Sequence, residues 1–220
     1  MTGAPLPPPD DLRWSLVVPI QDASRAKTRL EPPHPLSRSD LARAVARDTL
    51  EQVCRALPPE LVTVVTSDPA ATRIAGDLRA RVVADPGLGL NAAVRAGLEA
   101  QVPRSPGSHR PPAPVTGRAV LLGDLPSLRA EDLVQALVAC AAYPSAVVPD
   151  ADGTGTVLLA STTGAPEPQF GEGSAARHAR GATRLELDLP RLRRDVDTAD
   201  DLAAALQLGV GPHTARVLGQ

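Results

Sequence analysis

Short apolar runs alternate with segments of helical periodicity along most of the chain. Residues 14–20 are continuously apolar and include β-branched side chains, which is typical of a strand buried on both faces. The same reasoning predicts further strands at 61–66, 81–84, 119–122, 146–149, 156–160 and 183–187. Apolar positions three or four residues apart predict helices at 39–57, from 69 onward, and at 90–100, 130–142, 173–180 and 198–206.

The order of these elements indicates the fold class. Strand–helix alternation over the first 150 residues predicts βαβ units, and hence a three-layered α/β fold with a mainly parallel sheet. At 220 residues the chain fits one domain, which we expect over 13–210. We expect the Pro-rich segment 1–12 to be a disordered tail, 102–117 with its five prolines to be a mobile loop, and 211–220 to be a C-terminal tail.

Composition narrows the classes of function. Hydrophobic residues make up 43% of the chain and charged residues 22%, as in a soluble globular protein. A formal net charge of −2 gives no field that attracts nucleic acid, and one Trp, one Tyr and one Phe give no platforms for base stacking. No apolar run reaches the roughly 20 residues of a membrane span, and the N-terminus lacks the pattern of a signal peptide. We therefore expect a cytoplasmic protein for small molecules, with Cys54 and Cys140 as buried free thiols and a homodimer left open.

Ligands of such sheets bind beyond the carboxyl ends of the strands, so the polar residues at those positions are the candidates. The loop after the first strand carries Arg25, Lys27 and Arg29, and Lys27 is the only lysine of the chain. Three cations within five residues suit a polyphosphate, because arginine forks and a lysine ammonium bind phosphate oxygens differently. A solvated basic loop is the alternative interpretation.

Three carboxylates are candidates for a metal site. Asp124 follows the strand at 119–122, whereas Asp195 and Asp197 alternate along an extended segment and so lie on one side of it. Carboxylate oxygens suit Mg²⁺, which can bridge to phosphate oxygens. The alternatives are a helix-capping role for Asp124 and ordinary surface charge for the other two.

Two segments, 149–156 and 170–178, are rich in glycine and hydroxyl side chains and include Thr156 and Ser174. Glycine permits close approach of the backbone, and hydroxyl and N–H groups can bind a phosphate. The alternatives are a tight hairpin turn for the first segment and a structural role for His178 in the second. Together with the cations and carboxylates, these segments indicate two phosphorylated molecules around magnesium, and transfer of a phosphoryl or nucleotidyl group.

Six motifs in a fixed order carry a resemblance: VPIQDASRAKTRL, GLGLNAAVRAG, LLGDLP, PDADGTGT, FGEGSAARH and RRDVDT. Over roughly residues 15–206 the chain resembles the phosphoenolpyruvate and 2-phospho-L-lactate guanylyltransferases of deazaflavin coenzyme F-420 biosynthesis. The resemblance implies a GT-A-like nucleotidyltransferase fold with a mixed, mostly parallel sheet. It also implies Mg²⁺ as cofactor and transfer of GMP from GTP to the phosphate of a three-carbon acid.

The resemblance further implies roles for single residues. The positions that match the metal-binding acids are Asp124, Asp195 and Asp197. Those that match the binding site for the phosphate and carboxylate of the acceptor are Thr156, Gly171 and Ser174. Expected nucleotide contacts are Arg25, Lys27, Arg29 and Asn91, and the expected catalytic residues are Lys27 and Asp124. Family members usually carry a lysine where this chain has Gln21, so Arg25 or Lys27 must compensate here.

The acceptor itself is left open by spacing alone, because phosphoenolpyruvate, 2-phospho-L-lactate and 3-phospho-D-glycerate differ by one unsaturation or one hydroxyl. The composition is typical of high genomic GC content and favours an actinobacterial protein, for which the resemblance implies phosphoenolpyruvate. A CTP-dependent relative is disfavoured, since the loop at 20–30 has no glycine. A non-catalytic nucleotide-binding module is disfavoured by the presence of Asp124, Asp195 and Asp197.

Overall fold

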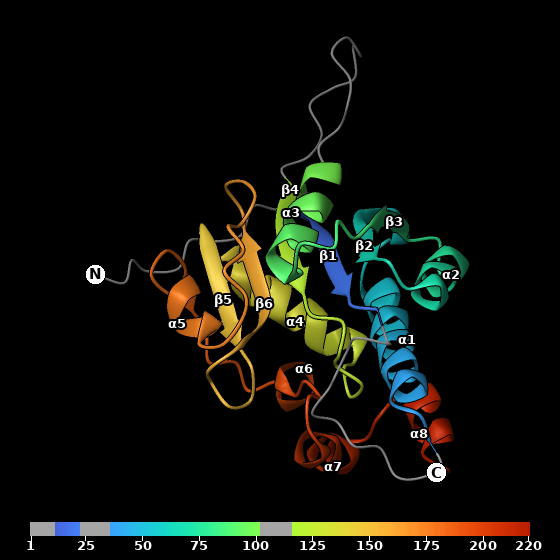
Figure 1. Ribbon diagram of the computed structural model, residues 1–220. Coiled ribbons are helices and arrows are strands. Elements are labelled where there is room, and N and C mark those ends of the chain that lie inside the picture. Colours follow the sequence, from blue (N-terminus) through green and yellow to red (C-terminus); the bar gives the residue numbers. More distant parts are fainter. Residues whose placement is uncertain (1–11, 23–35, 102–115) are drawn as a thin grey trace.

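The computed structural model of the chain describes residues 12–22, 36–101 and 116–220 (Figure 1). Within these residues seven strands form one sheet in the order β3-β2-β1-β4-β6-β5-β7. The strands are β1 (Arg13–Ile20), β2 (Val62–Thr66), β3 (Arg81–Ala84), β4 (Thr116–Leu121), β5 (Ser145–Pro149), β6 (Thr156–Ser161) and β7 (Thr183–Arg184). The helices are α1 (Arg38–Ala56), the 3-10 helix η1 (Pro59–Leu61), α2 (Pro69–Asp77), α3 (Leu90–Ala100), α4 (Ala130–Ala141), α5 (Ser174–His178), α6 (Pro190–Arg193), α7 (Ala199–Leu208) and α8 (Pro212–Val217).

The strand directions confirm the expected mixed, mostly parallel sheet. β1 pairs in parallel with β2 and β4, as β2 does with β3 and β5 with β7. Of the described strands, only β6 runs the other way, antiparallel to β4 and β5. The start of β6 therefore lies at the edge where β4 and β5 end, and the segments that leave or enter these strands meet there.

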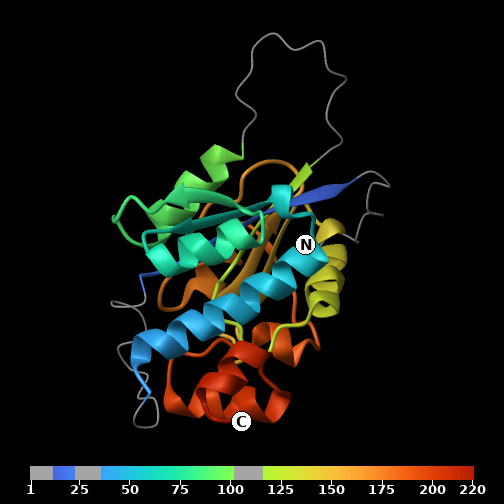
Figure 2. The same ribbon diagram turned by 90° about the vertical axis from the view of Figure 1, so that its right-hand side faces the viewer.

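Helices cover both faces of the sheet, which gives the three predicted layers (Figure 1, Figure 2). α1, α2 and α4 pack on one face, where Leu16 and Leu50 are fully buried. α3 covers the other face, with Val94 packed in the same cluster as Val17. Successive side chains of a strand point to opposite faces, so Leu16 and Val17 of β1 supply one residue to each of the two cores.

Local sequence fixes where two of the helices begin. Asp68 accepts the N–H groups of Ala70 and Ala71 at the start of α2. Thr198 caps α7, where it forms a capping box with Asp201. Each side chain accepts N–H groups that have no partner within the helix.

Several predicted boundaries are wrong. Residues 211–220 are not a plain tail, because α8 forms there and packs on α1. The N–H groups of its first residues are accepted by Asp48, more than 160 residues earlier in the chain, so no local pattern marks the helix.

Other boundaries differ as well. The strand expected at 183–187 is only β7, and α6 was not predicted. The loop expected at 102–117 ends earlier, since residues 116 and 117 begin β4; its other residues and residues 1–11 lie outside the described part.

Near the start of β1, a large side chain lies beside a glycine of β4. Trp14 is the only tryptophan of the chain, is 8% exposed and is the register partner of Gly117. A Cβ atom on Gly117 would lie 2.6 Å from the indole ring, so only glycine fits there.

The described helices do not indicate a membrane span, and the cysteines do not indicate a reactive thiol. None of the described helices is both long and apolar enough to cross a bilayer. Both cysteines are free thiols, Cys140 buried as expected and Cys54 only partly buried. Burial raises the pKa of Cys140 to about 12 and that of Cys54 to about 11, so both thiols stay protonated and unreactive at neutral pH.

Candidate active site

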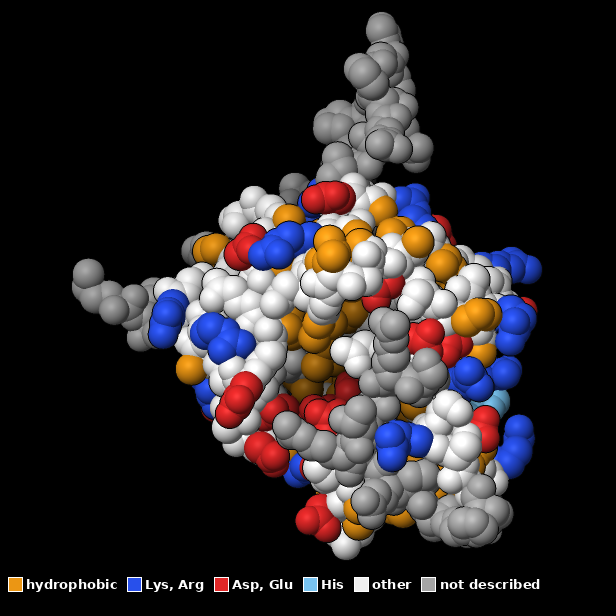
Figure 3. Space-filling model, viewed as in Figure 1, with side chains coloured by type: hydrophobic (Ala, Val, Ile, Leu, Met, Phe, Trp, Pro, Cys, Tyr) orange, Lys and Arg blue, Asp and Glu red, His pale blue; other side chains and the backbone are white. Residues whose placement is uncertain are grey.

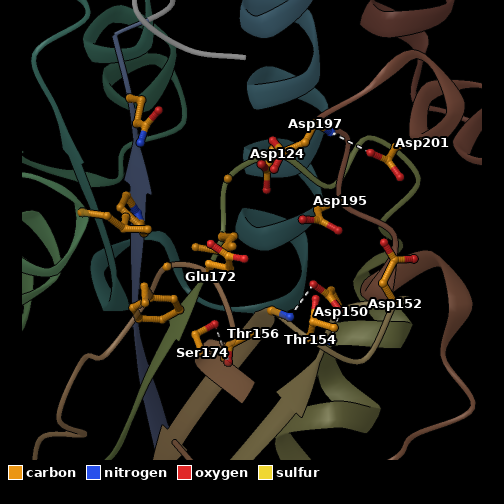
Figure 4. Close-up of a pocket in the computed structure, with 18 of the residues that line it drawn as sticks. Asp124, Asp150, Asp152, Thr154, Thr156, Glu172, Ser174, Asp195, Asp197 and Asp201 are labelled. Atoms are coloured by element: carbon orange, nitrogen blue, oxygen red, sulfur yellow. Dashed lines mark hydrogen bonds between the residues drawn. The ribbon is translucent and has the colours of Figure 1, made fainter. Parts of the chain in front are cut away.

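A pocket of about 610 Å³ opens at the edge of the sheet where β1, β4 and β5 end (Figure 3, Figure 4). Its lining includes Gln21 after β1, Asp124 after β4 and Asp150 after β5. Thr156 joins them from the start of the antiparallel β6, and Ser174 from the start of α5. The pocket therefore lies beyond the carboxyl ends of the parallel strands, where ligands of α/β sheets bind.

Acidic side chains dominate the polar part of the pocket, and Figure 3 shows carboxylates gathered below the apolar hollow. Seven of the described lining residues are acidic and none is Lys, Arg or His: Asp124, Asp150, Asp152, Glu172, Asp195, Asp197 and Asp201. Burial, followed by the charges of Asp124, Asp197 and Asp150, raises the pKa of Asp195 to about 8. This much negative charge needs a cation before a phosphorylated ligand can enter.

The three predicted metal ligands lie in one part of this pocket. The charges of Asp124 and Asp197 both raise the pKa of Asp195, and Figure 4 shows the three carboxylates near one another in the pocket. Carboxylates are hard oxygen donors, and a divalent cation could replace the proton that Asp195 keeps. The donor set therefore suits Mg²⁺, while the assignment of each ligand stays a prediction.

A different triad brings its possible ligand atoms closer together. Among the described residues, only Asp48, Glu51 and His213 place three such atoms within 4.8 Å of one another. These atoms already have partners: Asp48 accepts the N–H groups of His213 and Thr214, and Glu51 Oε1 lies 2.9 Å from His213 Nε2. The triad thus joins α1 to α8, whereas the carboxylates of the pocket are more widely spaced.

Asp150 builds the turn between β5 and β6. Its carboxylate oxygens accept the N–H of Thr154 at 3.0 Å and that of Gly155 at 2.7 Å. Arg193 donates to the Asp150 carbonyl oxygen at 2.9 Å and so ties this turn to α6. The hairpin interpretation of 149–156 is therefore right for Asp150, and the turn delivers Thr156 to the pocket.

Thr156, Ser174 and His178 form a buried hydrogen-bonded group, with 2%, 2% and 4% of each residue exposed. The Ser174 hydroxyl donates to Thr156 Oγ1 at 3.2 Å, and the same oxygen lies 2.9 Å from His178 Nδ1. The two hydroxyls line the pocket, but His178 does not. His178 therefore lies behind Thr156 and can act on a ligand in the pocket only through that residue.

The loop before α5 has fewer free amides to offer an external anion than its sequence suggests. Gly171 and Gly173 have φ angles of +122° and +68°, which favour glycine. The N–H of Ser174 donates to the Gly171 carbonyl, and that of Ala175 to the Thr154 carbonyl, both at 3.0 Å. Because these amides are already used within the chain, the hydroxyl groups supply much of the polarity on this side.

Asn91 holds the backbone of Phe170 from α3. Its Oδ1 accepts the Phe170 N–H at 2.7 Å and its Nδ2 donates to the Phe170 carbonyl at 3.1 Å. Asn91 is not among the described lining residues, so its contact with the nucleotide stays a prediction. The same holds for the predicted cations Arg25, Lys27 and Arg29, which lie outside the described residues.

Four acids of the lining were not predicted as site residues, namely Asp150, Asp152, Glu172 and Asp201. Arg194 lies 3.6 Å from Asp152 and 3.1 Å from Asp201, so it partly balances their charge. The Thr198-x-x-Asp201 capping pattern could have found Asp201, because it marks the start of α7 at the pocket.

Comparison with known proteins decides the family. Residues 41–189 match the family model described as the MobA-like NTP transferase domain. A phosphoenolpyruvate guanylyltransferase of Streptomyces scabiei is 46% identical over 213 residues, which cover 93% of this chain and 95% of that protein. That of Thermomonospora curvata is 46% identical over 210 residues, with 93% and 88% covered. The chain belongs to the phosphoenolpyruvate guanylyltransferase family. It is therefore a nucleotidyltransferase, as the six motifs implied.

Solved structures show how widely this guanylyltransferase family shares its fold. Rv0371C of Mycobacterium tuberculosis, in complex with manganese, has a TM-score of 0.55 at 21% identity, with 88% of this chain and 98% of that chain covered. The 4-diphosphocytidyl-2C-methyl-D-erythritolsynthase of Anaerococcus prevotii has a TM-score of 0.56 at 12% identity, with 90% and 97% covered. At these identities the likeness concerns the fold alone, which is confirmed as that of nucleotidyltransferases.

Proposed function

We propose that the enzyme transfers GMP from GTP to the phosphate of phosphoenolpyruvate, giving enolpyruvoyl-2-diphospho-5'-guanosine and pyrophosphate in coenzyme F-420 biosynthesis. The observation that carries this proposal is the 46% identity over 93% of the chain to a phosphoenolpyruvate guanylyltransferase. The acid-lined pocket with its two buried hydroxyls fits a reaction between two phosphorylated molecules. A cytoplasmic location belongs to the proposal, since two free thiols suit a reducing compartment.

The acceptor phosphate is its own nucleophile. Its second pKa is about 6, so most of it is a dianion at neutral pH and needs no general base. One of its oxygens forms a bond to the α-phosphorus of GTP, the bond from that phosphorus to the β-phosphate oxygen breaks, and pyrophosphate leaves with the electron pair.

Hydroxyl and backbone groups hold the acceptor in this proposal. The Thr156 hydroxyl binds an oxygen of the acceptor's phosphate or carboxylate from the β6–α5 side, together with the backbone at Gly171. Ser174 supports this contact, because it donates its hydroxyl hydrogen to Thr156. Positioning of this kind converts an encounter of two anions into a reaction within one complex.

Charge neutralisation falls to two other groups. Asp124, Asp195 and Asp197 would hold Mg²⁺, which neutralises phosphate charge and orients phosphate oxygens when bound. The loop outside the described residues carries the cations for the triphosphate, and Lys27 with Asp124 are the catalytic residues of the proposal.

The reaction is tested by incubating the enzyme with Mg²⁺, one of the four NTPs and one of three acids, and measuring pyrophosphate. We expect release only with GTP and phosphoenolpyruvate together. Release with 2-phospho-L-lactate or 3-phospho-D-glycerate would reassign the acceptor. Release with CTP alone, or release that does not depend on the acid, would overturn the proposal, and no release at all would favour a nucleotide-binding module.

One substitution tests the acidic centre. Asp124→Asn keeps the shape of the side chain but removes its charge, so we expect a normally folded protein whose kcat/KM falls about 100-fold or more. Asp200→Asn changes an exposed acid in the first turn of α7 and is the matched control, with activity unchanged. Pyrophosphate release and thermal melting are the measurements, and near-wild-type turnover by Asp124→Asn contradicts the assignment.

A further inference from the structure

The buried hydrogen bonds around His178 fix which ring nitrogen carries the proton. The backbone N–H of Gln169 donates to His178 Nε2 at 2.8 Å. A backbone N–H can only donate, so Nε2 must accept, and the proton of the neutral ring sits on Nδ1. His178 Nδ1 therefore donates to Thr156 Oγ1, which lies 2.9 Å away.

The direction of this bond decides what the Thr156 hydroxyl can do. A hydroxyl has one hydrogen to donate and two lone pairs that accept. One lone pair of Thr156 Oγ1 accepts from His178, and the other accepts from the Ser174 hydroxyl at 3.2 Å. The hydrogen of Thr156 is thus left for an acceptor outside this group, and Thr156 lines the pocket.

We infer that His178 is a positioning residue that makes the Thr156 hydroxyl a fixed hydrogen-bond donor to an oxyanion of the acceptor acid. The identity of that acid rests on the proposed function. His178 does not touch the ligand in this arrangement; it sets the polarity of the residue that does. A site whose hydroxyl can only donate favours phosphate or carboxylate oxygens over a ligand N–H or O–H group.

The surroundings of the ring keep this arrangement in place. Burial, followed by the nearby charge of Arg177, lowers the pKa of His178 to about 4, so the ring is neutral at physiological pH. The ring of Phe170 meets the imidazole edge to face at a centroid distance of 5.0 Å. Arg177 donates to the Gln169 carbonyl at 3.0 Å. This bond holds the backbone of Gln169, whose N–H donates to His178 Nε2.

Two substitutions separate the two nitrogens of His178. Gln can place its carbonyl oxygen near the Nε2 position and accept the Gln169 N–H, but it offers Thr156 no donor. Asn can place its amide nitrogen near the Nδ1 position and donate to Thr156, but it offers Gln169 no acceptor. We expect His178→Gln to raise the KM and the Kd for phosphoenolpyruvate at least about tenfold with the KM for GTP unchanged, and His178→Asn to raise them less.

The coupling to Thr156 is tested by a double-mutant cycle. In a Thr156→Val background, which lacks the hydroxyl, His178→Gln should raise the KM for phosphoenolpyruvate no further. His213→Gln, which changes the other described histidine at the α1–α8 contact, is the matched control. Equal or reversed effects of the Gln and Asn variants, or additive effects in the cycle, would mean that His178 only supports the fold.

A measurement without substrate or substitution keeps the inference separate from the proposed function. Nitrogen-15 NMR of the wild-type imidazole should show a neutral ring protonated on Nδ1, and a proton on Nε2 would overturn the inference. If the wild-type enzyme released no pyrophosphate, the proposed function would fail. The NMR spectrum and the binding of inorganic phosphate to the same variants would still test the role of His178.

Discussion

At the scale of single residues, burial keeps two titratable side chains neutral near the pocket. It raises the pKa of Asp195 to about 8 and lowers that of His178 to about 4. In both cases the charged form is the one that loses its hydration. The resting site is therefore less charged than its residue types suggest, until a cation draws the proton from Asp195.

The neutral His178 predicts a loss of stability in acid. Its pKa in the folded chain is about 4, whereas the ordinary value is 6.5. Between these values the unfolded chain binds a proton that the folded chain does not, so the free energy of unfolding falls as the pH drops from about 6.5 to about 4. The loss attributable to this group is about 3 kcal/mol and levels off below the folded pKa.

Urea titrations of the wild type and His178→Gln across this pH range isolate the effect, because every other group titrates in both proteins. The difference in unfolding free energy between them should shrink toward low pH. Parallel curves would contradict a lowered pKa for His178.

At the scale of elements, α8 depends on a partner far away in the sequence. The Asp48 carboxylate is 3% exposed and accepts the N–H groups of His213 and Thr214 at 3.0 and 2.7 Å. A Cβ atom on Gly211 would lie 2.3 Å from the Asp48 carboxyl carbon, so the chain approaches α1 closely here. The Asp48 side chain thus caps the last helix and holds its start against α1.

Removing that cap should loosen the end of the chain without abolishing the reaction. For Asp48→Ala we expect about 2 kcal/mol less unfolding free energy and a melting temperature lower by roughly 4–8 °C. Faster proteolysis within 211–220 should accompany the change. Glu51→Ala, one turn along α1, removes the partly exposed pairs with His213 and Arg47 and should cost less; equal losses would argue against the capping role.

At the scale of the whole molecule, a net charge of −2 hides an uneven distribution. Seven acids line one pocket, and no basic residue of the described chain does. A nucleoside triphosphate carries several negative charges, so its entry into this pocket depends on cations. The small net charge of the whole chain does not reveal that nucleotide entry depends on cations.

Removal of divalent metal therefore predicts loss of nucleotide binding as well as of turnover. With EDTA in excess we expect the affinity for GTP, measured by calorimetry, to fall about 100-fold or more, and Mg²⁺ to restore it. Mg²⁺ alone should raise the melting temperature, because it binds only the folded pocket. Unchanged GTP binding in EDTA would contradict this prediction and would leave the cations among residues 23–35 to bind the triphosphate.

Local patterns were sufficient for most elements and for the residues at strand ends. The run at 14–20 and the helix at 90–100 are close to β1 and α3, since burial on both faces and helical periodicity leave marks within a few residues. The acid at 124 was found because it directly follows a strand.

Contacts between distant segments left no such mark. Asn91 holds Phe170 across 79 residues and Asp48 caps a helix more than 160 residues away. His178 was more plausible as a structural residue because nothing near it in sequence reveals Thr156, its partner 22 residues earlier. Contacts at this range depend on the assembled tertiary structure and not on local propensity.

The single tryptophan gives this enzyme a built-in optical probe. Trp14 is buried beside Gly117 near the start of β1, whereas Ile20 at the other end of the strand lines the pocket. At about 3.3 Å per residue, the two ends are roughly 20 Å apart. Its emission should stay unchanged when ligands bind and shift to the red when the centre of the sheet unfolds. One fluorescence channel, free of any other indole, would then report unfolding even in solutions that contain every substrate.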